Sequence, residues 1–418
     1  MAAFGKKKKA SEFPDVIPVS EAIRKGDIFT KLTCLIMGAG NLARKQIIQG
    51  LLFLAGELAY ILYMVFFGAK ALQNFVTLGT ETQKKVFNEA TQVYEYATGD
   101  NSQLCLLYGV ITIFVTIGFI LLWRGAIRSS YIAQKAQEAG KKPITFGQIL
   151  KDLKDNRMYQ LFLFFPFLGI ILFTVMPLVF MILMAFTNYD RDHLPPGQLF
   201  DWIGFQNFAR VLNAGGALGE TFWKVLGWTI IWAIFATFLN YIFGIILAII
   251  INREGTKFKA FWRFIFVLTI AVPQFVSLLV VNTMIQEHGV INLLLKELFG
   301  VGPLPFLTNA TWARVTVIVI NLWVGIPYTL LAVTGILKNI PAELYEAAKV
   351  DGANAFVTFF KITMPYMMFV MTPNLITTFT GNINNFNVIY LLTNGAPACD
   401  TYYRGTAGKT DLLVTWLY

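Results

Sequence analysis

The sequence predicts an all-α, polytopic helical membrane protein. The chain of 418 residues is 56% hydrophobic and only 14% charged, whereas soluble domains carry about a quarter charged residues. It also contains seven apolar runs long enough for a bilayer core, which needs roughly 20 apolar residues per helix. The expected spans are residues 47–67, 104–123, 160–187, 225–251, 264–285, 314–337 and 364–392.

The distribution of basic residues predicts the orientation of these spans. Residues 1–46, 124–159, 252–263 and 338–363 hold 24 of the 34 Lys and Arg residues. Cytoplasmic loops carry such an excess, so we expect the N-terminus and the 338–363 loop in the cytoplasm. The run Lys6–Lys9 then belongs to a topogenic N-terminal arm, which we favour over a nucleic-acid site.

Few residues in the spans are suited to chemistry. The three cysteines and two histidines are widely spaced and predict neither a disulfide framework nor a metal site. Glu57 is the single ionisable residue inside a span, and we expect it to serve helix packing. Ion-driven carriers usually place charged groups along their pathway, so any transport by this chain is expected to draw its energy from outside it.

Six prolines fall within the spans and predict bent helices, because each removes a backbone donor. They are Pro166, Pro177, Pro273, Pro327, Pro365 and Pro373.

The last expected span carries an unusual polar face. Helical spacing aligns five of its residues: Asn374, Thr378, Gly381, Asn382 and Asn385. Two interpretations remain open. In one, the amides bond to neighbouring helices; in the other, which we favour, the face is a wetted surface for a neutral, polyhydroxylated solute.

The segment PAELYEAAKVDGANAFVTFFKITMP separates the last two expected spans. Pro341 fits the first turn of a helix, and Asp351-Gly352 is expected to end it with a left-handed glycine. A second helix is expected from about Ala353 to Lys361. Its stripe of Phe356, Phe359 and Phe360 predicts cover by a partner protein or by this chain's own helix ends.

This segment resembles the EAA signature of binding-protein-dependent ABC transporter permeases. The matching residues are Glu346, Ala347, Ala348, Gly352, Ile362 and Pro365, with Asp351 preceding the glycine. Met364 stands where the family usually has Leu. The resemblance implies that this loop docks into a cytoplasmic ATPase subunit and transmits its closure to the membrane helices.

Further runs within residues 160–418 resemble the maltose/maltodextrin-type permease subunit. They are NLWVGIPYTLLAVTGILKNIPAELYEAA, FTGNINNFNVIYLLTNGAP and DLLVTWLY. The resemblance implies a MetI-like permease core at 160–418, preceded by a basic arm at 1–46 and by two extra helices with a basic loop at 47–159. It implies ligand contacts from Val324, Gly325, Tyr328, Thr378, Gly381, Asn382 and Asn385.

The same resemblance implies the partners and the location. These are a second homologous permease, a dimer of cytoplasmic ATP-binding subunits, an extracytoplasmic sugar-binding protein and an oligosaccharide, all at the bacterial cell membrane. No cofactor is expected in this chain, because ATP is bound by the partner. The run RGTAGKT at 404–410 lacks the first glycine of a P-loop, since residue 403 is tyrosine.

Two features depart from this family. The 188–224 loop is short where the enteric maltose subunit carries a folded domain. The sequence also ends at Tyr418, where the family continues into one more helix, so we expect a truncated chain. A membrane glycosyl-transfer enzyme and an ion-coupled sugar carrier remain as alternatives. The enzyme would need a carboxylate or histidine cluster near the bilayer surface, and none is evident.

Overall fold

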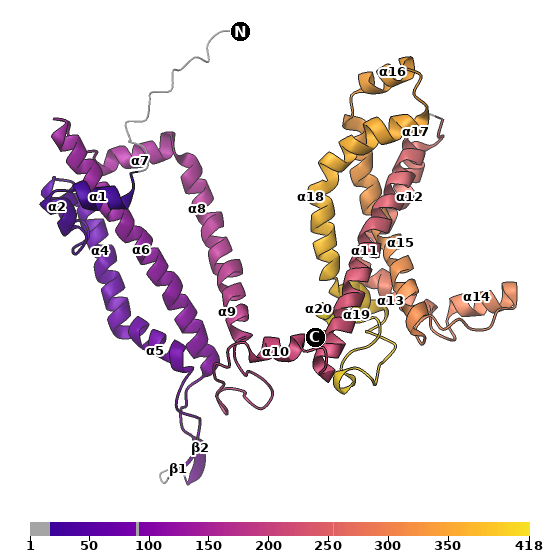
Figure 1. The fold of residues 1–418 in the computed structure, drawn as a ribbon, viewed down its shortest axis with the longest axis horizontal. Coiled ribbons are helices and arrows are strands. Elements are labelled where there is room, and N and C mark those ends of the chain that lie inside the picture. The colour runs from indigo at the N-terminus through magenta and orange to yellow at the C-terminus, as the bar shows by residue number, and fades with distance from the viewer. Residues whose placement is uncertain (1–16, 89–91, 254) are drawn as a thin grey trace. The chain divides into compact units, whose positions relative to one another are not determined.

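The computed structural model describes residues 17–88, 92–253 and 255–418, and these residues are mainly helical, as predicted (Figure 1). The chain divides into two compact units, Met1–Asn207 and Phe208–Tyr418. In the described residues, six helices are long and apolar enough to cross a membrane, and one bent pair would make a seventh span.

The first part of the chain contains nine α-helices and one hairpin among its described residues. Their bounds are α1 (Val19–Lys25), α2 (Ile28–Leu32), α3 (Ala39–Ala43), α4 (Ile47–Tyr63), α5 (Ala69–Thr77), β1 (Lys85–Asn88), β2 (Val93–Tyr96), α6 (Ser102–Glu138), α7 (Phe146–Asp155), α8 (Met158–Ile170) and α9 (Met176–Met184). A π-helical turn, Met64–Gly68, joins α4 to α5, and another, Ile171–Val175, joins α8 to α9.

The remaining elements begin with α10, which crosses the boundary of the two units. The bounds are α10 (Gln206–Leu212), α11 (Ala217–Asn252), α12 (Lys259–Ala271), α13 (Gln274–Met284), α14 (Val290–Phe299), α15 (Ala310–Asn339), α16 (Ala342–Val350), α17 (Ala355–Thr358), α18 (Met364–Ile383), α19 (Phe386–Leu392) and α20 (Leu413–Trp416). A π-helical turn, Phe359–Thr363, joins α17 to α18, and a 3-10 turn covers Tyr403–Gly405.

The segment before the first span is folded, although the sequence predicted only an arm there. Helices α1, α2 and α3 pack against α6. The guanidinium of Arg44, whose side chain is 3% exposed, donates to the carboxylate of Asp27 at 2.6 Å and to Ser130 Oγ at 3.1 Å. Thr30 Oγ1 donates to Gln134 Oε1 at 3.0 Å. The run Lys6–Lys9 lies outside the described residues.

The carboxylate of Asp27 is held ionised within this network. Burial by itself raises the pKa of Asp27, but hydrogen bonds from the Thr30 N–H and from Arg44 outweigh that effect. The pKa of Asp27 is therefore lowered from its ordinary value of 3.8.

Glu57 serves packing, as the sequence predicted. Its Oε2 accepts a hydrogen bond of 2.8 Å from the backbone N–H of Met37, in the turn that precedes α3. Because α3 packs closely against α4, this turn lies within hydrogen-bonding distance of Glu57. A Cβ atom on Gly38 would lie only 2.2 Å from the carbonyl oxygen of Gly50. The first span therefore holds the N-terminal segment through one carboxylate and one close glycine contact.

The antiparallel hairpin of β1 and β2 is a feature that the sequence analysis missed. Lys85 pairs with Tyr96 and Asn88 with Val93. Its strands have only four residues each and are largely exposed, so they carry no alternation of buried and exposed side chains from which a strand could be predicted.

Helix α11 forms the centre of the second unit. It packs against α15 and against α18 (Figure 1). One core cluster includes Trp232, Leu278 and Ile389, and a second includes Tyr241, Leu330 and Met367. The two clusters lie along successive stretches of α11, so this helix fixes the relative positions of the helices that carry the predicted ligand residues.

Two expected spans were wrong in their extent. The expected span 264–285 is two helices, α12 and α13, bent by 88°, because Pro273 directly precedes α13 and has no N–H to continue the helix. The expected span 364–392 ends at Ile383, and the chain restarts as α19 after Asn385, whose side chain accepts from the Val388 N–H. The apolar helix of this span instead begins at Ala355.

Two of the remaining prolines widen a helix instead of breaking it. Pro177 and Pro365 each follow a π-helical turn. A proline ring clashes with the carbonyl four residues earlier, which lies inside the π turn in both cases. The wider turn makes room for the ring, so both spans continue through their prolines.

Candidate functional site

The 338–363 loop forms a short helix and a glycine turn, as the sequence predicted. Helix α16 directly follows Pro341, with Glu343 in its first turn. Asp351 caps the end of the helix, and Gly352 follows with φ of +74°. Only glycine adopts this left-handed conformation routinely, so the sharp reversal after α16 depends on that residue.

The second helix of the loop is not separate from the membrane span, contrary to the expected helix from Ala353 to Lys361. Asn354 caps α17 by accepting from the Val357 N–H at 2.9 Å. The chain then stays helical through the π turn into α18, forming one helix of 29 residues, Ala355–Ile383. The loop therefore reaches the centre of the second unit without a break.

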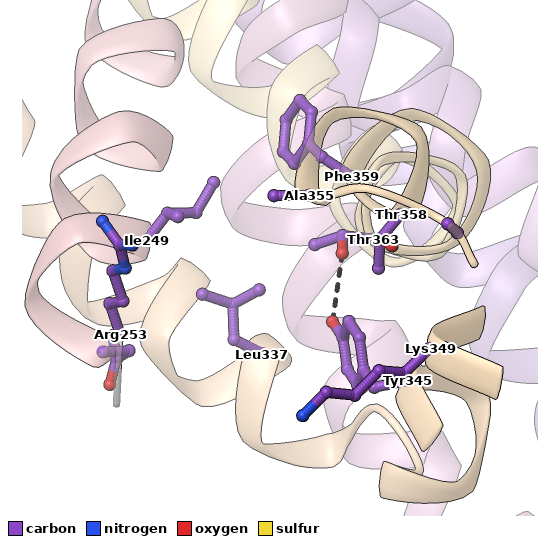
Figure 2. Close-up of a pocket in the computed structure, with 11 residues that line it drawn as sticks. Ile249, Arg253, Leu337, Tyr345, Lys349, Ala355, Thr358, Phe359 and Thr363 are labelled. Carbon is purple, nitrogen blue, oxygen red and sulfur yellow. Dashed lines mark hydrogen bonds between the residues drawn. The ribbon is translucent and has the colours of Figure 1, made fainter. Parts of the chain in front are cut away.

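A cavity of about 500 Å³ lies between this loop and the ends of α11 and α15 (Figure 2). Tyr345 and Thr363 face each other across it, and their hydroxyls form a hydrogen bond of 3.1 Å. Arg253 and Lys349 line the same cavity. Helix α16 is thus tied to the base of α18 by a side-chain contact as well as by the chain.

The matching residues of the EAA pattern are mostly on the outer surface of the loop. Glu346, Ala347, Asp351, Gly352 and Pro365 are exposed, Ile362 is half-buried and Ala348 is buried. The predicted aromatic stripe is split. The side chains of Phe356 and Phe360 are 71% and 50% exposed, whereas Phe359 packs against the Met367 core cluster.

Three predicted ligand residues lie on α15, and they do not share one environment. Val324 and Tyr328 line a small depression beside the bend between α12 and α13. Gly325 is a packing position, since a Cβ atom there would lie 2.3 Å from Asn240 Nδ2 on α11. The other side of this depression is formed by Thr269 and by residues that follow the bend.

The sequence analysis missed several polar side chains beside Tyr328. Gln274 and Ser277, which follow Pro273, line the same depression with Trp323 and Thr269. The signal was available in the sequence, because a proline within an apolar run marks a site where polar side chains and free backbone groups gather.

The predicted polar face of α18 is turned partly toward α11. Asn374 Nδ2 donates to Tyr241 Oη at 2.7 Å, and Asn382 Nδ2 donates to Thr237 Oγ1 at 2.9 Å. Asn385 Nδ2 donates to Asn382 Oδ1 at 3.3 Å. Interhelical bonding, one of the two interpretations left open above, is therefore present.

Two other residues of this face are not closely packed. Thr378 is half-buried, and Gly381 is exposed, with no atom from another part of the chain within 4 Å of the position that a Cβ would take. Within the described second unit, Asn240 Oδ1 and Asn321 Nδ2 are buried without a hydrogen-bond partner. Buried polar atoms are normally satisfied, so these two amides are exceptions within the core of the second unit.

Comparison with known proteins identifies the family. Residues 240–409 match the family described as binding-protein-dependent transport system inner membrane component. The chain is 36% identical over 401 residues to the galactooligosaccharides transport system permease protein GanP of Bacillus subtilis (strain 168), covering 93% of this chain and 88% of that protein. It is 34% identical over 397 residues to the maltodextrin transport system permease protein MdxF of the same organism, covering 93% and 86%.

Two other matches cover less of the chain. The maltose/maltodextrin transport system permease protein MalF of Escherichia coli (strain K12) is 40% identical over 233 residues, which is 55% of this chain and 44% of that protein. A solved bacterial ABC transporter involved in the import of the acidic polysaccharide alginate matches in fold, with a TM-score of 0.50 and 22% identity over 65% of this chain and 86% of that chain. The chain belongs to the inner membrane components of binding-protein-dependent transport systems, and it is a transport permease rather than an enzyme.

Proposed function

We propose that this chain is the permease subunit of an ATP-driven importer for a neutral oligosaccharide, such as a maltodextrin or a galactooligosaccharide. GanP and MdxF, which each align with 93% of this chain, are named for the transport of galactooligosaccharides and of maltodextrin, and they support that substrate class. The chain forms part of the translocation path together with a second, homologous permease. A sugar-binding protein delivers the solute from outside, and two cytoplasmic subunits hydrolyse ATP.

The observation that carries the coupling proposal is the unbroken helix Ala355–Ile383. Its first turn belongs to the 338–363 loop, and its last turn carries Asn382 on the polar face. A displacement of α16 is transmitted to Thr363, in the π-helical turn before α18, through the Tyr345–Thr363 hydrogen bond. Because a helix is stiff along its axis, movement at the loop shifts the polar face relative to α11.

The exposed side chains of the loop fit a docking surface for the ATPase subunit. Leu344, Val350 and Phe356 are 44%, 87% and 71% exposed, and Glu346 and Asp351 lie beside them. Apolar side chains gathered outside a membrane span usually meet a partner. These exposed side chains of α16 and α17 are therefore the proposed contact.

The packing within each unit supports a cytoplasmic N-terminus. In the second unit, Arg253 and Lys349 line one cavity, so the basic loops 252–263 and 338–363 lie at the same end. In the first unit, Gln46 Nε2 donates to the Ile144 carbonyl at 2.6 Å, which joins the N-terminal segment to the 124–159 loop. Within each unit, two basic segments therefore lie at the same end of the spans, as the positive-inside rule requires.

The proposed solute surface combines the polar face of α18 with the depression beside Tyr328. Amides and hydroxyls both donate and accept hydrogen bonds, and Tyr328 and Trp323 present 56% and 46% exposed rings. This chemistry suits sugar hydroxyls and the flat apolar faces of pyranose rings. It offers no charged group for an ionic solute.

The test is transport by the reconstituted assembly. Vesicles containing this chain, its partner permease and the ATPase subunits are supplied with the binding protein and a panel of labelled glycans. We expect uptake of a neutral oligosaccharide only when ATP and the ATPase are both present. Uptake by this chain alone along an ion gradient would refute the proposal and favour a secondary carrier.

A further inference from the structure

A cavity in the first unit has no role in the proposed transport. It measures about 540 Å³ and lies between the start of α1 and the middle of α6. Val19 and Ile23 line it from α1, and Ile120, Trp123, Arg124 and Arg128 line it from α6. We refer to it as the α1–α6 cavity.

Two arginines give this cavity a positive lining. Arg124 and Arg128 are four residues apart on α6 and therefore lie on one face, one turn above the other. Neither belongs to any of the ion pairs found among the described residues. The Nε–H of Arg128 is buried there without an acceptor. The planar fork of a guanidinium matches a phosphate group, which would accept from both side chains.

An apolar surface leads from these arginines into the span. Ile117, Ile120 and Leu121, on the preceding turns of α6, are 49%, 46% and 64% exposed. Trp123 marks the boundary, with its Nε1–H donating to the Cys34 carbonyl at 3.0 Å. Tryptophan is enriched at such membrane interfaces. A free phosphate ion would gain nothing from this surface, whereas an acyl chain would cover it.

We propose that the α1–α6 cavity binds an anionic phospholipid, with its phosphate between Arg124 and Arg128 and an acyl chain along Ile120 and Leu121. No carboxylate of the described residues lines the cavity, so the ammonium group of a zwitterionic lipid finds no partner. Basic pockets between helices on the cytoplasmic side of a membrane bind anionic headgroups in this way.

A bound lipid would hold α1 against the second span. Helix α1 has only seven residues and contributes one buried residue, Ala22, to its contact with Ile127 and Tyr131. This small contact alone contributes little to the packing of α1 against α6. The lipid would add contacts to both helices at once, and the proposal does not depend on which sugar is transported.

The experiment compares lipid retention by the assembled transporter containing the full chain. Wild type, Arg124→Gln/Arg128→Gln and the control Lys151→Gln/Lys154→Gln are purified after exchange into phosphatidylglycerol or phosphatidylcholine, and bound lipid is counted by native mass spectrometry. The control removes the same charge from α7, whose lysines do not line the cavity. We expect roughly tenfold or greater loss of phosphatidylglycerol from the arginine variant alone. Equal retention by all three proteins would overturn the proposal.

Two further arms keep the test decisive. If the double variant does not assemble, Arg124→Gln, at an exposed position, and Ile23→Trp, which fills the cavity, should each release the lipid. Retention of phosphatidylglycerol by both would contradict the proposal. Millimolar inorganic phosphate should leave the lipid bound. If phosphate displaces it, the arginines bind a free anion and the lipid assignment is wrong.

Discussion

Replacement of Gly352 by valine tests whether the turn after α16 transmits motion. Gly352 has φ of +74°, and no atom lies within 4 Å of the position that its Cβ would occupy. A valine side chain therefore meets no steric obstacle in the loop itself. Its cost is conformational, about 1–2 kcal/mol for a left-handed residue, and it is greater for a β-branched side chain.

The conformational cost of valine at position 352 affects the turn after α16 and not the membrane spans. Since about 1.4 kcal/mol corresponds to a factor of ten in an equilibrium, the equilibrium constant for forming the native turn falls roughly 5- to 30-fold. We expect the spans to be unaffected because Gly352 is exposed and a side chain at this position would contact no other part of the chain. We expect normal insertion of Gly352→Val, with sugar uptake reduced about tenfold or more.

The assay measures uptake and binding-protein-stimulated ATP hydrolysis in the same proteoliposomes. Gly352→Asn is the matched control, because asparagine tolerates the left-handed region and adds a side chain of similar volume. It should retain most of the wild-type uptake. Equal uptake by Gly352→Val and wild type, at equal protein content, would refute the role of the turn in coupling.

Three further outcomes are expected. Asn382→Ala should weaken sugar uptake at low substrate concentration while leaving basal ATP hydrolysis unchanged, because the lost interhelical bond is worth only about 0.6 kcal/mol; a parallel change in both activities would contradict the site assignment. Gly325→Ala should lower the melting temperature in detergent, because its Cβ displaces Asn240 and overpacking costs about 1–3 kcal/mol; an unchanged melting temperature would argue against close packing there. The lowered pKa of Asp27 stabilises the fold above pH 3.8, and this contribution is lost as pH falls through the folded-state pKa. Tryptophan fluorescence should therefore change as the pH falls, because packing around Trp123 is lost, and this change should be smaller in Asp27→Asn. Identical pH profiles for the two proteins would exclude a contribution of Asp27 to stability.

The helical fold was predictable because a bilayer imposes length and polarity on every span. The apolar runs at 225–251 and 314–337 both fall inside single helices, α11 and α15. The sequence was misleading at 364–392, where one run long enough for a span contains the end of α18 at Ile383 and the cap of α19 at Asn385. An apolar run of suitable length does not reveal where a helix is re-capped by a side chain.

The geometry of the candidate site was predictable only in part. The glycine turn at Gly352 follows from local chemistry, since few other residues adopt its backbone conformation. By contrast, the partners of Asn374 and Asn382 lie 133 and 145 residues away, on α11. Such pairings depend on how helices pack, and nothing in the local sequence indicates them.

The N-terminal segment stabilises the first span, because it supplies the hydrogen-bond donor for the Glu57 carboxylate. A chain shortened to begin at the first span would keep every apolar run, yet it would strip Glu57 of the Met37 amide that now satisfies it. It would also leave Gln134 and Ser130 without their partners Thr30 and Arg44. Tags and truncations placed among residues 17–46 therefore disturb the interior of the protein.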